Sequence, residues 1–228
     1  MSAPKQAVVV PRIASRCQLE TFYELAPERR WLGAKHLPKC VASSLGAHAV
    51  SIPRHIVGFL ASRGLKLATA ESCTAGLIAS VLAEVPGSGS CLDVGFVTYS
   101  PSGKAGFLGV RQETMDRFGL TSEEVAREMA EGALAQEACA VDIAVANTGV
   151  ADRSPAGGPP PGTQCFAWSL RGRDGRVVTA SETRIFTGSR NDIRYAAALY
   201  ALSRIPALFD SMRMATACAT SGHEHNSR

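Results

Sequence analysis

Short apolar segments alternate with segments of helical spacing between residues 53 and 210, and this alternation constrains the fold more than any other feature of the sequence. Each helix must bury an apolar stripe and each strand an apolar face, so an alternating chain packs its helices over a sheet. We therefore expect an α/β fold, a three-layer sandwich with a mixed, mostly parallel sheet. The expected strands lie at 65–70, 92–99, 141–146, 163–170 and 176–186, and the expected helices at 53–62, 74–84, 121–138 and 190–209.

Two local signals indicate how these elements begin and connect. Thr121-Ser122-Glu123-Glu124 is typical of a capping box, in which side chains satisfy the free N–H groups of a first helical turn. Asp174-Gly175 lies between the last two strand candidates, and this pair favours a tight hairpin turn. The last two strands are therefore predicted to pair in antiparallel fashion.

The two ends of the chain differ in character from the region between them. Prolines at positions 4, 11, 27 and 38 interrupt any helix near the N-terminus, and the last residues are small and polar. We expect an N-terminal extension over residues 1–52 that is partly disordered, one domain over 53–210, and a flexible tail over 211–228.

Charge and composition exclude several classes of partner. The net charge of +4 arises within residues 1–50, and acidic and basic residues balance over the rest of the chain, which argues against a nucleic-acid partner. No apolar run approaches the roughly 20 residues that span a bilayer, which argues against membrane insertion. The seven cysteines form no C-x-x-C pair, so we expect reduced thiols in a cytoplasmic protein.

Few bases are available within the expected domain. All five histidines lie outside residues 56–210, which argues against a Ser-His-Asp triad or a histidine-rich zinc site. The only lysines within residues 56–210 are Lys66 and Lys104. Because arginine stays protonated, Lys104 is the best amine base, provided that burial lowers its pKa. The alternative is an ordinary surface lysine.

The stretch Ala70-Glu71-Ser72-Cys73-Thr74-Ala75-Gly76 joins a strand candidate to a helix candidate. At such a turn Ser72 could present its hydroxyl to a substrate while nearby backbone N–H groups stabilise an oxyanion. The alternative is that these polar residues only cap the following helix. Cys73 is a second candidate nucleophile because a helix N-terminus favours a thiolate, but no histidine of the domain is available to activate it.

Two further features could bind an anion. The stretch from Asn147 to Gly162 leaves a strand and enters a loop rich in glycine and proline, where the backbone can approach a phosphate. Arg190 and Arg194 lie four residues apart at the start of a helix candidate, so they share one face. The alternatives are an exposed connection and a solvated helix face.

Four segments carry a family resemblance: Ala70–Gly76, the block Tyr99-Ser100…Lys104…Leu108-Gly109-Val110, the stretch Ser122–Ala133, and Thr148-Gly149-Val150-Ala151. In this order, from about residue 55 to 208, they resemble the C-terminal domain of the CinA family, the nicotinamide mononucleotide deamidases. The resemblance implies an amidohydrolase that converts the carboxamide of nicotinamide mononucleotide to a carboxylate and releases ammonia. It implies a small-molecule pyridine nucleotide as partner, with no metal and no cofactor. We also expect a homodimer.

The resemblance assigns roles to particular residues. It implies Ser72 as the nucleophile, Lys104 and Tyr99 as its activating partners, and Thr148 as a polar group near the reacting carboxamide. The expected substrate-binding residues are Glu71, Cys73, Thr74, Gly76, Gly149, Arg190 and Arg194.

The chain departs from the family pattern at three places. The family usually has glycine at the position of Ala75, asparagine at that of Pro101, and Gly-Pro at that of Asp152-Arg153. Asp152 adds a negative charge where a nucleotide phosphate approaches, and its Cβ restricts backbone angles that glycine allows. The alternative function is a catalytically silent relative that binds a nucleotide or a protein partner through the same cleft.

Overall fold

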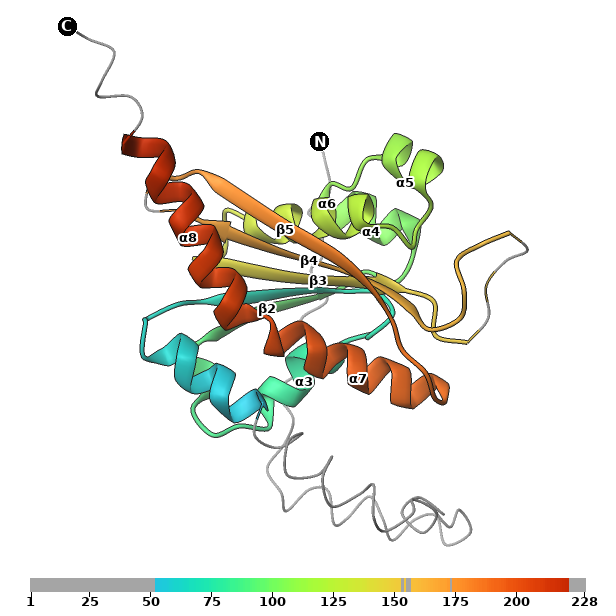
Figure 1. Ribbon diagram of the computed structural model, residues 1–228, viewed down its shortest axis with the longest axis horizontal. Helices are drawn as coiled ribbons and strands as arrows, with labels where there is room; N and C mark the ends of the chain where they lie inside the picture. The colour runs from blue at the N-terminus through green and yellow to red at the C-terminus, as the bar shows by residue number, and fades with distance from the viewer. Residues whose placement is uncertain (1–51, 153, 155–156, 173, 222–228) are drawn as a thin grey trace, which may run out of the picture. The chain divides into compact units, whose positions relative to one another are not determined.

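A five-stranded sheet forms the middle layer of the protein in a computed structural model that describes residues 52–152, 154, 157–172 and 174–221 (Figure 1). The expected N-terminal extension lies outside these residues, apart from Ile52, which is helical. The strands follow the spatial order β2-β1-β3-β4-β5. They are β1 (Leu67–Glu71), β2 (Leu92–Val97), β3 (Ile143–Gly149), β4 (Thr163–Arg171) and β5 (Val177–Ile185).

Helices cover both faces of the sheet, which confirms the three-layer α/β arrangement (Figure 1). One face carries a helix over residues 52–61, α3 (Leu77–Ala83), α7 (Arg190–Ser203) and α8 (Ile205–Ser221). The other face carries α4 (Pro101–Leu108), α5 (Gln112–Phe118) and α6 (Glu123–Leu134). A 3₁₀ turn, η1 (Ser88–Ser90), precedes β2. None of the described helices is long and apolar enough to cross a membrane.

The sheet is mixed, as expected, but the expectation that it is mostly parallel needs a correction. Strand β1 pairs in parallel with β2 and β3, whereas β4 is antiparallel to both β3 and β5. The described pairings are thus evenly divided. The reason is that the chain passes from β3 to β4 and from β4 to β5 without a crossover helix, and such connections return the chain in the opposite direction. The predicted hairpin across Asp174-Gly175 is confirmed.

Side chains on the inner strands sort by size between the two faces. Bulky residues of β1, β3 and β4 join α3, α7 and α8 in one core, whereas alanines of the same strands join α6 in the other. Strand side chains alternate between faces, so this sorting follows from a two-residue period. The bulky set is Leu67, Ile143, Val145, Phe166, Trp168 and Leu170, and the small set is Ala68, Ala70, Ala144, Ala146 and Ala167. The helix α6 consequently packs on a flat surface of small residues.

The first turn of α6 forms where the capping signal predicts it. Ser122 is the N-cap, and its side chain accepts a hydrogen bond from the Val125 N–H. The helix ends at Leu134, before the expected residue 138. Within it, Gly132 lies against the end of α4, because a Cβ there would lie 1.8 Å from the Leu108 carbonyl oxygen. This close approach fixes α4 against α6.

The C-terminal helix is longer than expected and divided in two. Helix α7 ends at Ser203, and α8 begins at Ile205 with Pro206 in its first turn, where proline is tolerated. Helix α8 continues to Ser221, and Met212 belongs to the hydrophobic core. The expected boundary between domain and flexible tail at residue 210 is therefore too early.

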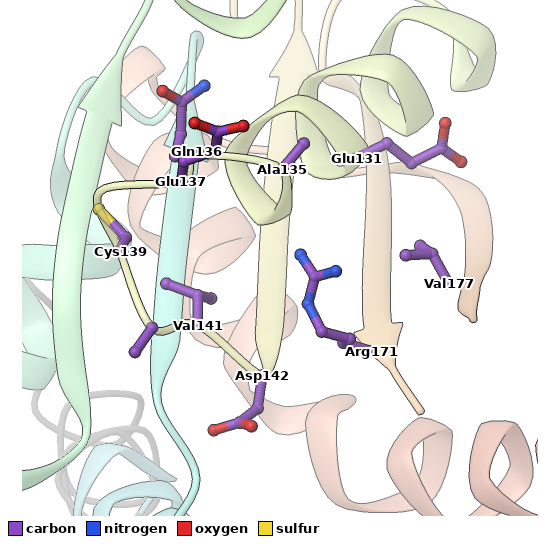
Figure 2. Close-up of a pocket in the computed structure, with 10 residues that line it drawn as sticks. Glu131, Ala135, Gln136, Glu137, Cys139, Val141, Asp142, Arg171 and Val177 are labelled. Atoms are coloured by element: carbon purple, nitrogen blue, oxygen red, sulfur yellow. The ribbon is translucent and has the colours of Figure 1, made fainter. Parts of the chain in front are cut away.

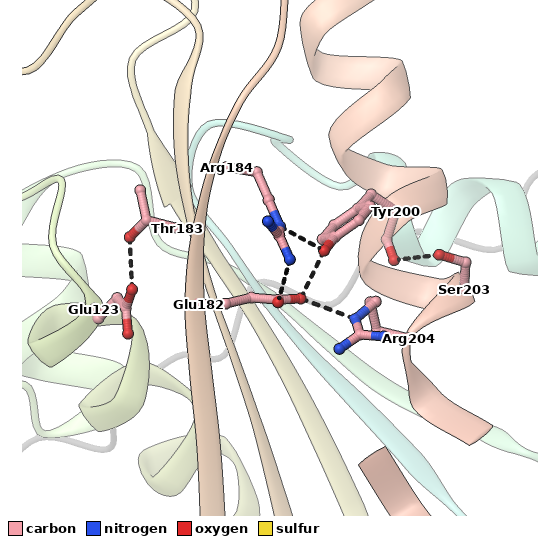
Figure 3. Close-up of polar contacts among 7 residues, drawn as sticks. All are labelled: Glu123, Glu182, Thr183, Arg184, Tyr200, Ser203 and Arg204. Atoms are coloured by element: carbon pink, nitrogen blue, oxygen red, sulfur yellow. Dashed lines mark hydrogen bonds and ion pairs between the residues drawn. The ribbon is translucent and has the colours of Figure 1, made fainter. Parts of the chain in front are cut away.

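A carboxylate on β5 ties the edge of the sheet to α7 and to Arg204, the residue between α7 and α8 (Figure 3). Glu182 accepts hydrogen bonds from Tyr200 Oη at 2.8 Å, Arg204 Nε at 3.0 Å and Arg184 Nη2 at 3.1 Å. Burial opposes the charged form, but these donors lower the pKa of Glu182. The adjacent Thr183 bonds to Glu123 of α6, on the opposite face. Strand β5 is thus fastened to both helical layers.

Candidate active site

Ser72 lies directly after β1, a central strand, at the start of the turn that leads into α3. Its backbone N–H donates to the Asn147 carbonyl at the end of β3, at 2.9 Å. The residue is 8% exposed. In an open α/β sheet, ligands gather at the carboxyl ends of the parallel strands, and Ser72 occupies that position.

The Lys104 side chain contacts Ser72 from α4, the helix that follows the neighbouring strand β2. Its Nζ lies 2.9 Å from Ser72 Oγ, 2.8 Å from the Thr98 carbonyl oxygen and 3.5 Å from that of Tyr99. The N-cap Ser100, which accepts from the Gly103 N–H, starts α4 so that Lys104 falls on its buried side. Lys104 is 1% exposed. This burial lowers the pKa of its ammonium from 10.5 to about 8.

This geometry suits proton transfer between an amine and a hydroxyl. A neutral lysine amine has two hydrogens and one lone pair, and the two carbonyls of Thr98 and Tyr99 can accept the hydrogens. The lone pair then faces Ser72 Oγ and can take its proton. A pKa near the working pH is the condition under which such a base is effective.

Glu71 supports the turn that leads into α3, and its expected substrate contact stays a prediction. Its carboxylate is fully buried and accepts the N–H groups of Ile78 and Ala79, each at 3.0 Å, and the Thr69 hydroxyl at 3.0 Å. Helix α3 begins at Leu77, and its N-cap residue Gly76 has no side chain that could accept a hydrogen bond. The carboxylate therefore supplies the missing acceptors and complements the helix dipole.

Two buried amides, which the sequence did not single out, hold the serine turn in place. Asn147 Oδ1 accepts the Thr74 N–H at 3.1 Å, and Asn147 Nδ2 donates to Gln164 Oε1 at 3.1 Å. Gln164 Nε2 donates in turn to the Val150 carbonyl at 3.2 Å and to Cys73 Sγ at 3.4 Å. Both amides are fully buried. A signal was present, because Gln164 is a long polar residue next to the apolar run from Cys165 to Trp168 in β4.

Cys73 lies next to Ser72 but is the poorer nucleophile. Its side chain is buried, and this burial raises the pKa of the thiol despite the hydrogen bond from Gln164 and the nearby arginines. A thiol is reactive only as the thiolate, so a raised pKa disfavours it. The side chain packs with Ala151 and Ile193 in a small apolar cluster.

Arg194 of α7 binds the backbone of the serine turn, and its expected phosphate contact stays a prediction. Its Nε donates to the Cys73 carbonyl at 2.9 Å, and its Nη2 donates to the Thr74 carbonyl at 3.0 Å. Thr74 itself is fully buried. Because these donors already bind the backbone of the serine turn, Arg194 fastens α7 to that turn.

The end of β3 completes the floor of the site. Thr148 is buried, and its hydroxyl donates to the Leu120 carbonyl at 2.7 Å, which leaves this oxygen only as an acceptor. At position 149 only glycine fits, because a Cβ there would lie 2.5 Å from the Gln164 side chain. The role expected for Thr148 stays a prediction, and Gly149 serves the packing of Gln164.

Three exposed side chains lie beside these buried residues, and we call this group the rim. It consists of Tyr99, Asp152 and Arg190. Arg190 Nη1 lies 2.7 Å from Asp152 Oδ1, and Arg190 Nη2 donates to Tyr99 Oη at 3.0 Å. Their side chains stay largely open to solvent, and Tyr99 is 58% exposed. The Tyr99 side chain thus meets Arg190, whereas only its backbone carbonyl approaches Lys104.

A cavity of about 950 Å³ lies elsewhere on the molecule (Figure 2). It is lined by residues from the end of α6, the segment before β3, the end of β4 and the start of β5, among them Glu131, Asp142 and Arg171. Asp142 precedes the amino end of β3, whereas Ser72 follows the carboxyl end of the parallel strand β1. The cavity therefore lies at the opposite end of the strands and has no part in the Ser72 site.

Fold and site together define an α/β protein with a buried serine–lysine pair. The chain belongs to the CinA C-terminal domain family, whose model matches residues 49–209. The family predicted from the four motifs is therefore confirmed.

Named relatives and solved structures agree with this assignment. A putative competence-damage inducible protein of Symbiobacterium thermophilum is 39% identical over 210 residues, which cover 88% of this chain but only 47% of that protein. The nicotinamide-nucleotide amidohydrolase PncC of Escherichia coli is 42% identical over 149 residues, which cover 64% of this chain and 86% of PncC. The crystal structure of the competence/damage inducible protein CihA from Agrobacterium tumefaciens matches with a TM-score of 0.63 and 37% identity, covering 71% of this chain and 95% of CihA.

Proposed function

We propose that the protein is an amidohydrolase that converts nicotinamide mononucleotide to nicotinate mononucleotide and ammonia, with Ser72 as nucleophile. The observation that carries this proposal is the 2.9 Å contact between Ser72 Oγ and Lys104 Nζ, in which burial lowers the pKa of the lysine. The name of the E. coli relative PncC supports the substrate. A cytoplasmic location and a homodimer remain predictions.

The first half of the reaction forms an ester on Ser72. Ser72 Oγ attacks the carboxamide carbon while its proton moves to the neutral Lys104 amine. The tetrahedral oxyanion needs a hydrogen-bond donor, and the Cys73 N–H has no acceptor among the described residues. Lys104 then returns the proton to the departing nitrogen, which leaves as ammonia.

The second half releases the product. Lys104, again neutral, takes a proton from water as the water oxygen attacks the ester carbon. The bond to Ser72 Oγ breaks, and the proton passes from Lys104 to that oxygen. The nicotinate nucleotide then loses its acid proton to solvent and leaves as a carboxylate. One lysine therefore serves as base and acid in both halves, and the sum is hydrolysis of one amide.

A second candidate function is ligand binding without turnover. The ion pair between Arg190 and Asp152 favours it, because this carboxylate already occupies a guanidinium that could hold a substrate phosphate. The buried Ser72–Lys104 contact favours catalysis instead. Turnover therefore separates the two functions.

The test is release of ammonia and nicotinate mononucleotide from nicotinamide mononucleotide, followed by nuclear magnetic resonance. The parent protein should turn over, and Ser72→Ala should lose at least about a thousandfold in kcat. Ser80→Ala, an exposed serine in α3, is the matched control and should keep the parent rate. Folded parent protein without turnover on ample substrate would support the binding function and overturn the proposal.

A further inference from the structure

The charged pair at the rim lies close to the reacting groups. Asp152 follows β3, Arg190 begins α7, and their side chains meet at 2.7 Å. The same Arg190 bonds to Tyr99, whose backbone carbonyl approaches Lys104 at 3.5 Å. The charges of Arg190 and Asp152 also act on the Cys73 thiol in opposite directions, which places both near the serine turn.

Arg190 is the guanidinium of this rim that can meet an anionic substrate group. Arg194, on the same helix, donates from Nε and Nη2 to the backbone of the serine turn. The Nη1 and Nη2 of Arg190 face exposed partners, Asp152 and Tyr99, which water or a ligand can replace. A phosphate that enters here therefore meets Arg190 and Asp152 together.

Asp152 opposes such a phosphate in two ways. It occupies Arg190 Nη1, and a carboxylate and a phosphate both seek the same guanidinium donors. After displacement it remains a negative charge near a dianion, and the repulsion between such groups at a partly exposed site changes affinity by roughly tenfold. An unphosphorylated ribosyl ligand meets neither obstacle, because its hydroxyls can donate to the carboxylate.

We propose that Asp152 is a specificity-determining residue, which competes with the substrate phosphate for Arg190 and so lowers the preference of this site for phosphorylated over unphosphorylated ribosyl amides. This inference rests on the proposed function for its kinetic test. It concerns the choice of substrate and not the chemical step, so its effect belongs to KM.

The kinetic test compares kcat/KM for nicotinamide mononucleotide and for nicotinamide riboside. In Asp152→Asn the ratio of the two values should rise about tenfold over the parent ratio, through a lower KM for the mononucleotide with kcat unchanged. Asp174→Asn is the matched control, since Asp174 pairs with Arg176 in the β4–β5 turn, and it should keep the parent ratio. A ratio in Asp152→Asn within twofold of the parent would overturn the proposal.

A binding test works even if the protein does not turn over. Calorimetry with ribose 5-phosphate, and with ribose as the unphosphorylated control, measures the competition directly. Asp152→Asn should bind ribose 5-phosphate about tenfold more tightly than the parent, and Arg190→Gln should bind it more weakly than both. Equal affinity in the parent and Asp152→Asn would contradict the proposal, whereas a tenfold difference without any turnover would contradict only the proposed function.

Discussion

The buried and the exposed halves of the site use polar side chains in opposite ways. Ser72, Lys104 and Asn147 are at most 8% exposed, and each has fixed partners within hydrogen-bond distance. Asp152 and Arg190 at the rim have side chains that are 51% and 45% exposed, although their contact is equally short. The same kind of contact therefore has a different energetic weight in each half.

The difference lies in the surrounding medium. In the buried half, removal from water lowers the pKa of Lys104 to about 8. The surrounding protein therefore sets the pH at which the amine becomes neutral. At the rim, water screens the ion pair, and exposed pairs contribute about 0–1 kcal/mol. We infer that changes in the buried half affect the chemical step and stability, whereas changes at the rim affect the choice of ligand.

The largest expected effect comes from removing the buried amine. Lys104→Met keeps the length and apolar stem of the side chain but deletes the base, so kcat should fall by roughly 10³-fold or more. Steady-state ammonia release measures this loss, with circular dichroism to establish that the variant folds. Lys66→Met, at a residue just before β1, is the control and should keep the parent kcat. A folded Lys104→Met with parent activity would contradict the division between the halves.

The pH dependence should show a nearly hundredfold effect. Below about pH 8 Lys104 is protonated and cannot take the Ser72 proton, so kcat/KM should fall roughly tenfold per pH unit towards pH 6. Because Lys104 is active only as the neutral amine, kcat/KM should rise with pH up to about pH 8 and stay constant above it. An exposed lysine would give a rise that continues to about pH 10. Profiles from pH 6 to pH 10 distinguish these cases, and a flat profile would exclude Lys104 as the base.

Patterns that act locally could be predicted from the sequence. The alternation of strands and helices predicted the layers, and Ser122 predicted the start of α6. Asp174-Gly175 predicted the hairpin. Each of these signals depends on residues that are neighbours in the chain. Ser72 and Lys104 were identified from residue types and family motifs, and the structure brings them together at 2.9 Å.

Interactions between distant segments could not be predicted in the same way. Helix α4 was missed because Pro101, Gly103 and Gly106 obscure its pattern, although proline is well placed in a first turn. The hydrogen bond between Asn147 and Gln164 links residues of two strands, and no local period reveals it. The inward placement of the Glu71 carboxylate could not be predicted either, because it depends on the free N–H groups at the start of α3.

Gln164 tests how far the buried half depends on its amides. Gln164→Leu keeps the volume but leaves Asn147 Nδ2 without its acceptor, so the free energy of unfolding should fall by about 1–3 kcal/mol. Urea unfolding measures this loss, and kcat should fall with it as the Ser72 turn loosens. The exposed Gln112→Leu in α5 is the control and should change stability by about 0.5 kcal/mol or less. Equal losses in the two variants would remove the distinction between buried and exposed amides.

The smallest effect is expected at Ala75, an exposed residue of the turn that contains Ser72. Its side chain is exposed, its N–H bonds to the Ser72 carbonyl at 3.1 Å, and its φ of 50° is left-handed. A Cβ in this conformation costs about 1–2 kcal/mol, and glycine gives back roughly 0.5–1 kcal/mol through the entropy of the unfolded chain. Ala75→Gly should therefore raise the free energy of unfolding by about 0.5–1 kcal/mol, whereas Ala207→Gly within α8 should lower it by a similar amount. Because Glu71, Asn147 and Arg194 hold the serine turn from the buried side, kcat should not change, and a changed kcat would show that the strained backbone itself positions Ser72.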